Sequence, residues 1–194
     1  MSYSEGIYVF QARAIRQFAR MNRSLLLATC AALFVLSFAA TAEPDSKRAA
    51  QIEAMWKAES LGGLRCGSAE EAVVKLLGKP EQRGKVMLQE ADGNYGQQWD
   101  YPAKGIELTM SSGAKKSGTK TVFAIIASSG CTLATQKGIK IGSAEGAVRK
   151  AYGAFEDRER KGAGELVVSV DGGEMWFSFK DGKVDRMAYG PGPE

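Results

Sequence analysis

The chain has 194 residues, of which 44% are hydrophobic and 25% are charged, which is typical of one compact, soluble domain. Its formal net charge is +4, but residues 1–42 hold four arginines and one glutamate, which leaves 22 basic and 21 acidic residues in the remainder. That balance of +1 gives no bulk-charge argument for a nucleic acid or an anionic membrane as partner.

Residues 21–42 have the pattern of a secretory signal peptide. Basic residues precede an apolar run, and residues 40–42 (Ala-Thr-Ala) form a small-x-small cleavage site. The apolar run is shorter than the roughly 20 residues of a membrane-spanning helix, and no later run could stop transfer. We therefore predict a start at Met21, cleavage after Ala42, no transmembrane span in the mature form, and export to the bacterial periplasm or the medium.

The chain has three cysteines, the first of which lies within this leader. Cys30 ends a weak lipobox-like tetrad, but the apolar run continues past it to Phe38, which argues against a lipid anchor. Cys66 and Cys131 remain after cleavage. Two cysteines in an exported domain are most simply one disulfide, which would stabilise it by about 4 kcal/mol through loop closure. The alternative, a reactive thiol pair, lacks the C-x-x-C spacing.

The segment 43–60 follows the leader and precedes the rest of the domain. Ala49, Ile52 and Met55 recur at helical spacing. Two interpretations stay open, a helix docked on the domain and an arm that becomes ordered on a partner.

An internal repeat is the strongest signal in the sequence. Residues 64–83 and 139–158 align without a gap, and both contain Gly-Ser-Ala-Glu followed by a helix-like apolar spacing. We interpret this match as a duplication that produces two units in one compact domain, repeat 1 over 61–130 and repeat 2 over 131–194.

Each unit is predicted to begin with a short helix. Ser68 and Ser143 are expected to be N-caps whose hydroxyls accept from first-turn amides, and Glu71 would complete a capping box in the first unit. Gly78 and Gly153 are expected to end the two helices.

Three strands are predicted after each helix. Apolar residues alternate along them, and Gly172-Gly173 and Asp181-Gly182 mark turns in the second unit. The predicted fold class is α+β, with two tandem helix-plus-three-strand repeats forming an antiparallel sheet that has helices packed on one face.

Several short motifs resemble a known superfamily. Gly-Ile-Lys-Ile-Gly-Ser-Ala-Glu (138–145), Leu-Gly-Lys-Pro (77–80) and Asp-Gly-Lys-Val (181–184) are similar to the SmpA/OmlA (BamE) family, and two such units in tandem over 61–190 resemble the BLIP family of beta-lactamase inhibitor proteins. The resemblance implies helices packed on an antiparallel sheet and protein binding in the envelope or outside the cell. It departs from the family in the cysteines, because BLIP disulfides lie within each repeat. No family functional residue carries over.

The residue types argue against an enzyme. The chain has no histidine, which excludes Ser-His and Cys-His nucleophiles and histidine-containing metal sites. Its glycine-rich stretches match neither the Walker nor the dinucleotide pattern, and the Asp92 and Asp171 turns lack the ligand spacing of a calcium loop. We predict no metal and no cofactor, and a hydrolase that uses only two carboxylates is the third-ranked reading.

Strand alternation predicts a binding face. If Met175 and Phe177 face the helices, Trp176 faces the other way, and Trp is enriched in binding hot spots. The alternative is that the segment 46–59 or the C-terminal tail covers Trp176. The predicted protein-binding residues on the open face are Gln98, Asp100, Glu107, Thr109, Val167, Ser169, Glu174, Trp176, Ser178 and Arg186.

The sequence therefore predicts an exported, non-catalytic protein-binding module, either an inhibitor or immunity protein or an envelope-assembly factor. The alternative is a periplasmic protein that binds a small ligand in the groove between the repeats. Nothing in the sequence names the partner.

Overall fold

The computed structural model describes residues 45–90, 92–157, 159, 160, 162 and 164–191. The chain divides into two compact units, residues 1–48 and 49–194. In the first unit, only 45–48 are described, and they are helical. The predicted leader, the start at Met21 and the lipobox cysteine Cys30 lie outside the described residues.

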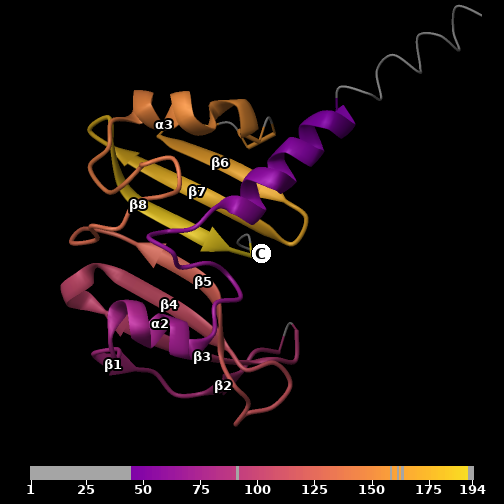
Figure 1. Ribbon diagram of the computed structural model, residues 1–194, viewed down its shortest axis with the longest axis vertical. Helices are drawn as coiled ribbons and strands as arrows, with labels where there is room; N and C mark the ends of the chain where they lie inside the picture. Colours follow the sequence, from indigo (N-terminus) through magenta and orange to yellow (C-terminus); the bar gives the residue numbers. More distant parts are fainter. Residues whose placement is uncertain (1–44, 91, 158, 161, 163, 192–194) are drawn as a thin grey trace, which may run out of the picture. The chain divides into compact units, whose positions relative to one another are not determined.

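The second unit is built on a single antiparallel sheet, as predicted (Figure 1). The described strands lie in the order β1-β3-β4-β5-β8-β7-β6, and β2 also pairs with β3. The strands are β1 (Gln82–Arg83), β2 (Met87–Leu88), β3 (Tyr95–Tyr101), β4 (Ile106–Ser111), β5 (Thr121–Ala127), β6 (Glu165–Val170), β7 (Gly173–Lys180) and β8 (Lys183–Gly190).

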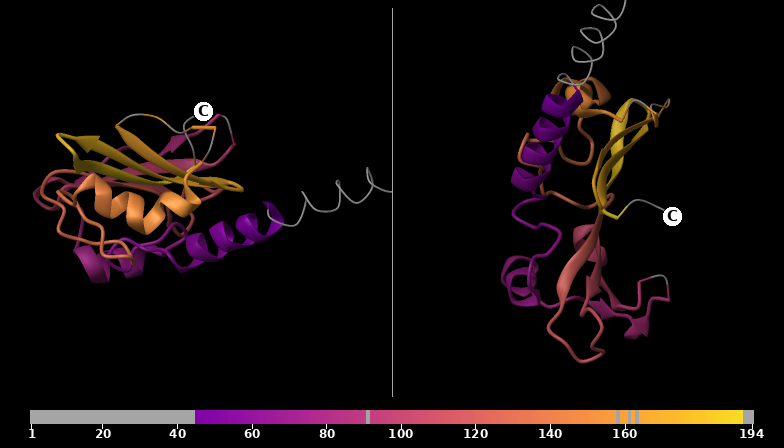
Figure 2. Two further views of the ribbon diagram at one scale, coloured as in Figure 1. Left: turned by 90° about the horizontal axis from the view of Figure 1, so that it is seen from above. Right: turned by 90° about the vertical axis from the view of Figure 1, so that its right-hand side faces the viewer.

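Helices cover one face of this sheet (Figure 2). They are the helical residues 49–58, α2 (Glu70–Leu77) and α3 (Glu145–Tyr152), with the short 3₁₀ turns η1 (Pro102–Lys104) and η2 (Gly153–Phe155). The fold class is thus α+β, with one antiparallel sheet.

The core lies between the sheet and the helices, because alternate strand residues point there. Ile106, Leu108 and Met110 of β4 are each at most 2% exposed. The segment before α2 joins the same core, since Ile52 and Met55 are each 9% exposed and belong to its cluster. Residues 49–60 of this segment therefore dock on the domain.

The approaches to α2 and α3 use matching hydrogen bonds. The Gly67 amide donates to the Val122 carbonyl oxygen in β5, and the Gly142 amide donates to the Val184 carbonyl oxygen in β8, each over 2.7 Å. Each helix start is therefore joined to the third of the long strands that follow it.

The predicted serine caps are wrong. The N-cap of each helix is the alanine after the serine, and neither cap makes a side-chain hydrogen bond. The hydroxyl oxygens of Ser68 and Ser143 instead accept from the amides of Arg65 and Lys140, each over 3.0 Å. The capping box with Glu71 is absent because the serine closes the turn before the helix, and strand-loop carbonyls accept from the first helical amides.

The two helix ends also differ from each other. α2 ends at Gly78, whose φ of 82° suits glycine, as predicted. α3 ends at Gly153, which has an ordinary right-handed φ of −59° and begins η2. Both glycines therefore end their helices as predicted, but only Gly78 does so with a positive φ.

A buried polar cluster lies on the helix side of the sheet, where the segments that precede α2 and α3 (the two linkers) meet. The Glu59 carboxylate is 5% exposed, and its Oε1 accepts from the amides of Ser60 and Gln136 over 2.9 and 2.8 Å. Its Oε2 accepts from the Tyr152 hydroxyl over 2.7 Å, and that hydroxyl also lies 2.7 Å from the Thr135 hydroxyl. Burial raises the pKa of Tyr152. The cluster joins the segment before α2 to the segment before α3.

The predicted disulfide is absent. Cys66 and Cys131 are free thiols, the first exposed and the second buried. Backbone hydrogen bonds hold the two cysteines in separate places. The Gly67 amide, next to Cys66, donates to β5, and the Cys131 amide donates to the Ser128 carbonyl oxygen. The spacing of two cysteines in a sequence cannot reveal such separate anchoring.

Two glycines provide a test of the backbone geometry. Gly105 and Gly142 both have positive φ, 59° and 83°. A Cβ at Gly105 would lie 2.3 Å from the Ser129 carbonyl oxygen, whereas nothing lies within 4 Å of a Cβ at Gly142. We predict that Gly142→Ala costs about 1 kcal/mol from backbone strain alone, and that Gly105→Ala costs several times more. Urea unfolding measures both, and equal losses would contradict this.

Candidate functional site

The outer face of the sheet, away from the helices, carries the predicted binding residues. Trp99 and Tyr101 are each 1% exposed and point into the core, so Gln98 and Asp100 point outward. Cross-strand partners share a face, and the register pairs Gln98 with Thr109 and Asp100 with Glu107.

The same register reaches across the second half of the sheet. Trp176 of β7 lies between Val167 of β6 and Ala188 of β8, and Ala188 pairs with Ile126 of β5. One row of side chains therefore runs from the acidic β3–β4 pair through Ile126 to Trp176.

A chain segment before β6 covers part of this face. The Asp157 amide donates to the Val167 carbonyl oxygen over 2.8 Å, and the Ser169 hydroxyl donates to the Asp157 carboxylate over 2.6 Å. Arg160 forms an ion pair with Glu174. Three of the predicted contact residues therefore already have intramolecular partners.

This covering changes the predicted site. Val167 is 1% exposed, so it cannot contact a partner directly, and its placement on an accessible surface is wrong. Glu174 and Ser169 lie on the expected face but are already bound by Arg160 and Asp157, respectively. These long-range contacts give the physical reason for the difference.

Trp176 is half-buried on the outer face. Its indole nitrogen donates to Glu165 Oε2 over 2.8 Å. Glu165 was not among the predicted binding residues. The segment before α2 does not reach Trp176, since its Trp56 ring lies against Gly173 on the helix side. The indole is therefore positioned by its own sheet face.

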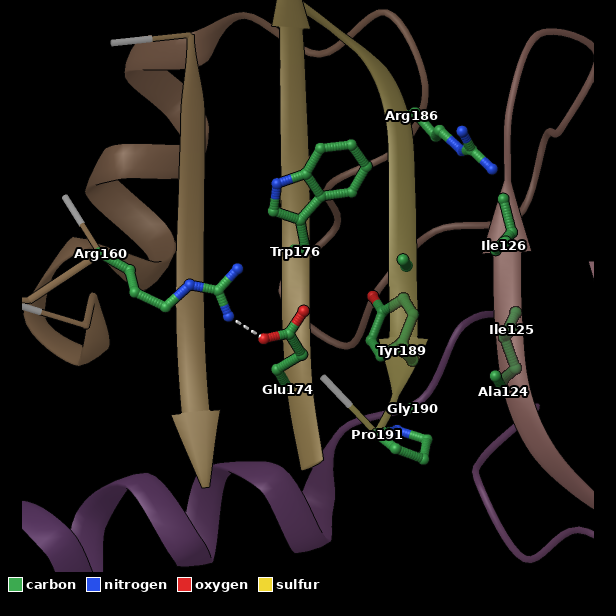
Figure 3. A pocket seen from close by; sticks show the side chains of 11 residues that line it. Ala124, Ile125, Ile126, Arg160, Glu174, Trp176, Arg186, Tyr189, Gly190 and Pro191 are labelled. Carbon is green, nitrogen blue, oxygen red and sulfur yellow. Dashed lines mark hydrogen bonds and ion pairs between the residues drawn. The ribbon is translucent and has the colours of Figure 1, made fainter. Parts of the chain in front are cut away.

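Beside Trp176, the outer face is hollowed along the pairing of β5 with β8 (Figure 3). The hollow has a volume of about 320 Å³. Its lining is mostly apolar, with charged side chains from three elements at its edge. The lining residues are Ala124, Ile125, Ile126, Arg160, Glu174, Trp176, Arg186, Ala188, Tyr189, Gly190 and Pro191.

Gly190 brings the two strands close together at this hollow. A Cβ there would lie 2.7 Å from Ala124 Cβ and 3.2 Å from the Phe123 carbonyl oxygen. The backbone itself therefore forms part of the floor, and a side chain at this position would force β5 and β8 apart.

Two groups of charges on the outer face bear on the choice of a partner, one at the hollow and one on β3 and β4. Arg186 is exposed and has no ion-pair partner within the part of the chain that the structure describes. Asp100 and Glu107 lie directly opposite each other, and like charges in this arrangement destabilise a sheet. A partner with complementary charges would relieve both conditions.

Sequence reasoning missed the small apolar residues of the hollow. Ala124, Ile126 and Ala188 have ordinary alternation, and only Ile126 could have been placed outward from its spacing to Ile125 and Ala127. Which strands would be neighbours was needed to bring them together, because β5 and β8 are far apart in sequence.

The described residues offer no metal site. Within the described ranges, no group of three or more His, Cys, Asp or Glu side chains converges in a way that could hold a metal ion. The perturbed thiols do not form a nucleophilic site either, because burial raises the pKa of Cys66 to about 11 and also raises that of Cys131.

Comparison with protein-family models, with curated proteins and with solved structures gives no match. The resemblance in the sequence motifs therefore remains a prediction. None of the helices in the described ranges has both the length and the apolar character that a membrane-spanning helix requires.

The Asp157–Ser169 contact predicts a pH dependence. The donated hydroxyl hydrogen bond lowers the pKa of Asp157 below its ordinary value of 3.8. A carboxyl whose pKa is lower in the folded state contributes stability above the unfolded pKa and loses it as the pH falls through the folded pKa. We expect the free energy of unfolding of wild type to exceed that of Asp157→Asn by less than about 1 kcal/mol at pH 7, and this difference to be lost as the pH falls below the ordinary pKa of 3.8. Urea unfolding across this range measures the difference, and a constant difference would contradict the prediction.

Proposed function

We propose that the protein is an exported, non-catalytic binding module that docks a protein partner on the outer face of its sheet. The observation that carries this proposal is the apolar hollow between β5 and β8, bordered by Trp176 and by the exposed Arg186. Large aromatic side chains and arginine at a recessed apolar surface are the usual anchors of protein interfaces.

We propose further that the domain arose by duplication of one helix-plus-three-strand unit. The matching bonds from Gly67 to Val122 and from Gly142 to Val184 support this origin, as does the order of the long strands. In that order, the last strand of each unit pairs with the last strand of the other, which places the hollow between the units.

The charges favour a partner of particular chemistry. An apolar side chain would enter the hollow against Ile126 and Trp176, and a neighbouring carboxylate would pair with Arg186. A basic group on the same partner would lie over Asp100 and Glu107. Such an arrangement gives both specificity and steering in the approach.

The export part of the proposal rests on the signal-peptide pattern over 21–42. The resemblance to the BLIP and SmpA/OmlA (BamE) families supports an inhibitor, immunity or envelope-assembly role for a module of this kind. No observation favours the carboxylate hydrolase over binding, because neither Asp100 nor Glu107 belongs to the hollow.

Site-specific photo-crosslinking tests the docking face. A photoreactive residue replaces either Ile126 in the hollow or Leu76 on α2, which is 47% exposed on the helix side. In the native host, the probe at 126 is expected to yield one discrete protein adduct and the probe at 76 none. Trp176→Ala and Arg186→Glu should each reduce the adduct at least about tenfold. Equal adducts from both positions, or an adduct insensitive to both substitutions, would refute the proposal.

The same variants need a stability control. Trp176 is half-buried, so we expect Trp176→Ala to lower the free energy of unfolding by about 1–2 kcal/mol. Trp99→Ala, at a residue 1% exposed, should cost about 3–5 kcal/mol. If Trp176→Ala costs as much as Trp99→Ala by urea unfolding, Trp176 is a core residue and not an anchor.

A further inference from the structure

A second, smaller pocket lies on the helix side of the sheet, beneath the segment that precedes α2. Its volume is about 220 Å³, below the range of about 300–1,000 Å³ typical of sites for drug-sized ligands. It therefore suits a molecule of only a few heavy atoms. It is lined by Trp56, Lys57, Glu59, Ser60, Leu64, Arg65, Cys66 and Tyr189.

Tyr189 lines this pocket, and its buried hydroxyl has no hydrogen-bond partner among the described residues. The residue is 5% exposed, and its hydroxyl is the buried side-chain polar atom that lacks a hydrogen bond among the described residues. Burial raises the pKa of Tyr189, and the nearby Glu59 charge raises it further, so the hydroxyl is neutral and can both donate and accept. An unpaired buried hydroxyl costs about 1–3 kcal/mol, which a ligand atom in the pocket would recover.

A buried carboxyl group, that of Glu59, also lines this pocket. Glu59 accepts from two amides and from the Tyr152 hydroxyl, all of them neutral donors. It has no ion-pair partner within the described ranges. A buried carboxylate without a countercharge attracts a cationic group, and the aromatic rings of Trp56 and Tyr189 would favour the same charge.

The opposite charge lines the pocket at exposed residues. Arg65 is exposed, and its Nη1 donates to the Lys57 carbonyl oxygen over 2.8 Å, which leaves its remaining N–H groups without a partner in the described part of the chain. Lys57 is also exposed and pairs with Glu53 over 3.1 Å. An anionic group at the mouth would meet the free side of the Arg65 guanidinium.

We propose that this pocket binds a small zwitterion, namely a free α-amino acid with a short side chain. Its ammonium group would lie toward Glu59 and the Tyr189 hydroxyl, and its carboxylate toward Arg65. A purely cationic ligand would be repelled by Arg65 and Lys57, and a purely anionic one by Glu59. Both ends of the pocket are satisfied together only by separated charges of both signs. The pocket and the outer hollow lie on opposite faces, so this proposal and the docking proposal fail independently.

Calorimetry and thermal unfolding with amino acids and with their single-charge analogues test the ligand class. Glycine carries both charges, methylamine only the ammonium group, and acetate only the carboxylate. Glycine or alanine is expected to bind and to raise the melting temperature, and methylamine and acetate should each bind at least about tenfold more weakly. Equal binding of methylamine and glycine, equal binding of acetate and glycine, or no binding of any amino acid would overturn the proposal.

Substitutions at two lining residues test the named groups. Tyr189→Phe removes only the unpaired hydroxyl, so the free protein should be at least as stable as wild type, while the affinity for glycine falls about tenfold. Arg65→Gln should produce a similar loss. Tyr95→Phe makes the same atomic change in β3, away from the pocket, and should bind as wild type does. Unchanged affinity in both Tyr189→Phe and Arg65→Gln would overturn the proposal.

Discussion

The antiparallel pairing of β5 with β8 holds the two halves of the sheet together. It has three residue pairs in register, whereas the pairings within the halves, β3–β4, β4–β5, β6–β7 and β7–β8, have six or seven. The hollow on the outer face lies along this pairing, and the small pocket on the helix side touches it through Tyr189. Tyr189 of β8 contributes to the lining of both. The junction is thus the shortest of the pairings between long strands, and the outer hollow lies along it.

Reinforcement of this junction comes from buried polar contacts on the helix side. The Leu61–Thr135 bridge and the bond from the Gly62 amide to the Ala134 carbonyl oxygen tie the two linkers together. Glu59 extends the tie to Tyr152 of α3. Removing one partner of a buried charged network costs much more than the network adds over an apolar core, because the remaining charge is left unsatisfied. The cluster therefore specifies how the linkers cross the sheet more than it adds to total stability.

The short-range sequence pattern predicted which strand residues face the core and where the helices lie. Alternation placed Met175 and Phe177 inward, and the repeated Gly-Ser-Ala-Glu segment located both helices to within a residue. The serine caps failed because a hydroxyl can serve the turn before a helix as well as the helix itself. Other features depend on long-range contacts. These are the separation of the two cysteines, the contacts of Asp157 and Arg160, and the two-residue strands β1 and β2. The hollow depends on them as well, since finding it required knowing that β5 and β8 are neighbours.

The close approach of Gly190 to Ala124 links the two faces mechanically. Any side chain at 190 would act as a wedge that spreads β5 from β8. The wedge would enlarge the outer hollow and, through the adjoining Tyr189, displace the hydroxyl that lines the inner pocket. One hydrogen atom at this position is what keeps the two surfaces in their present alignment.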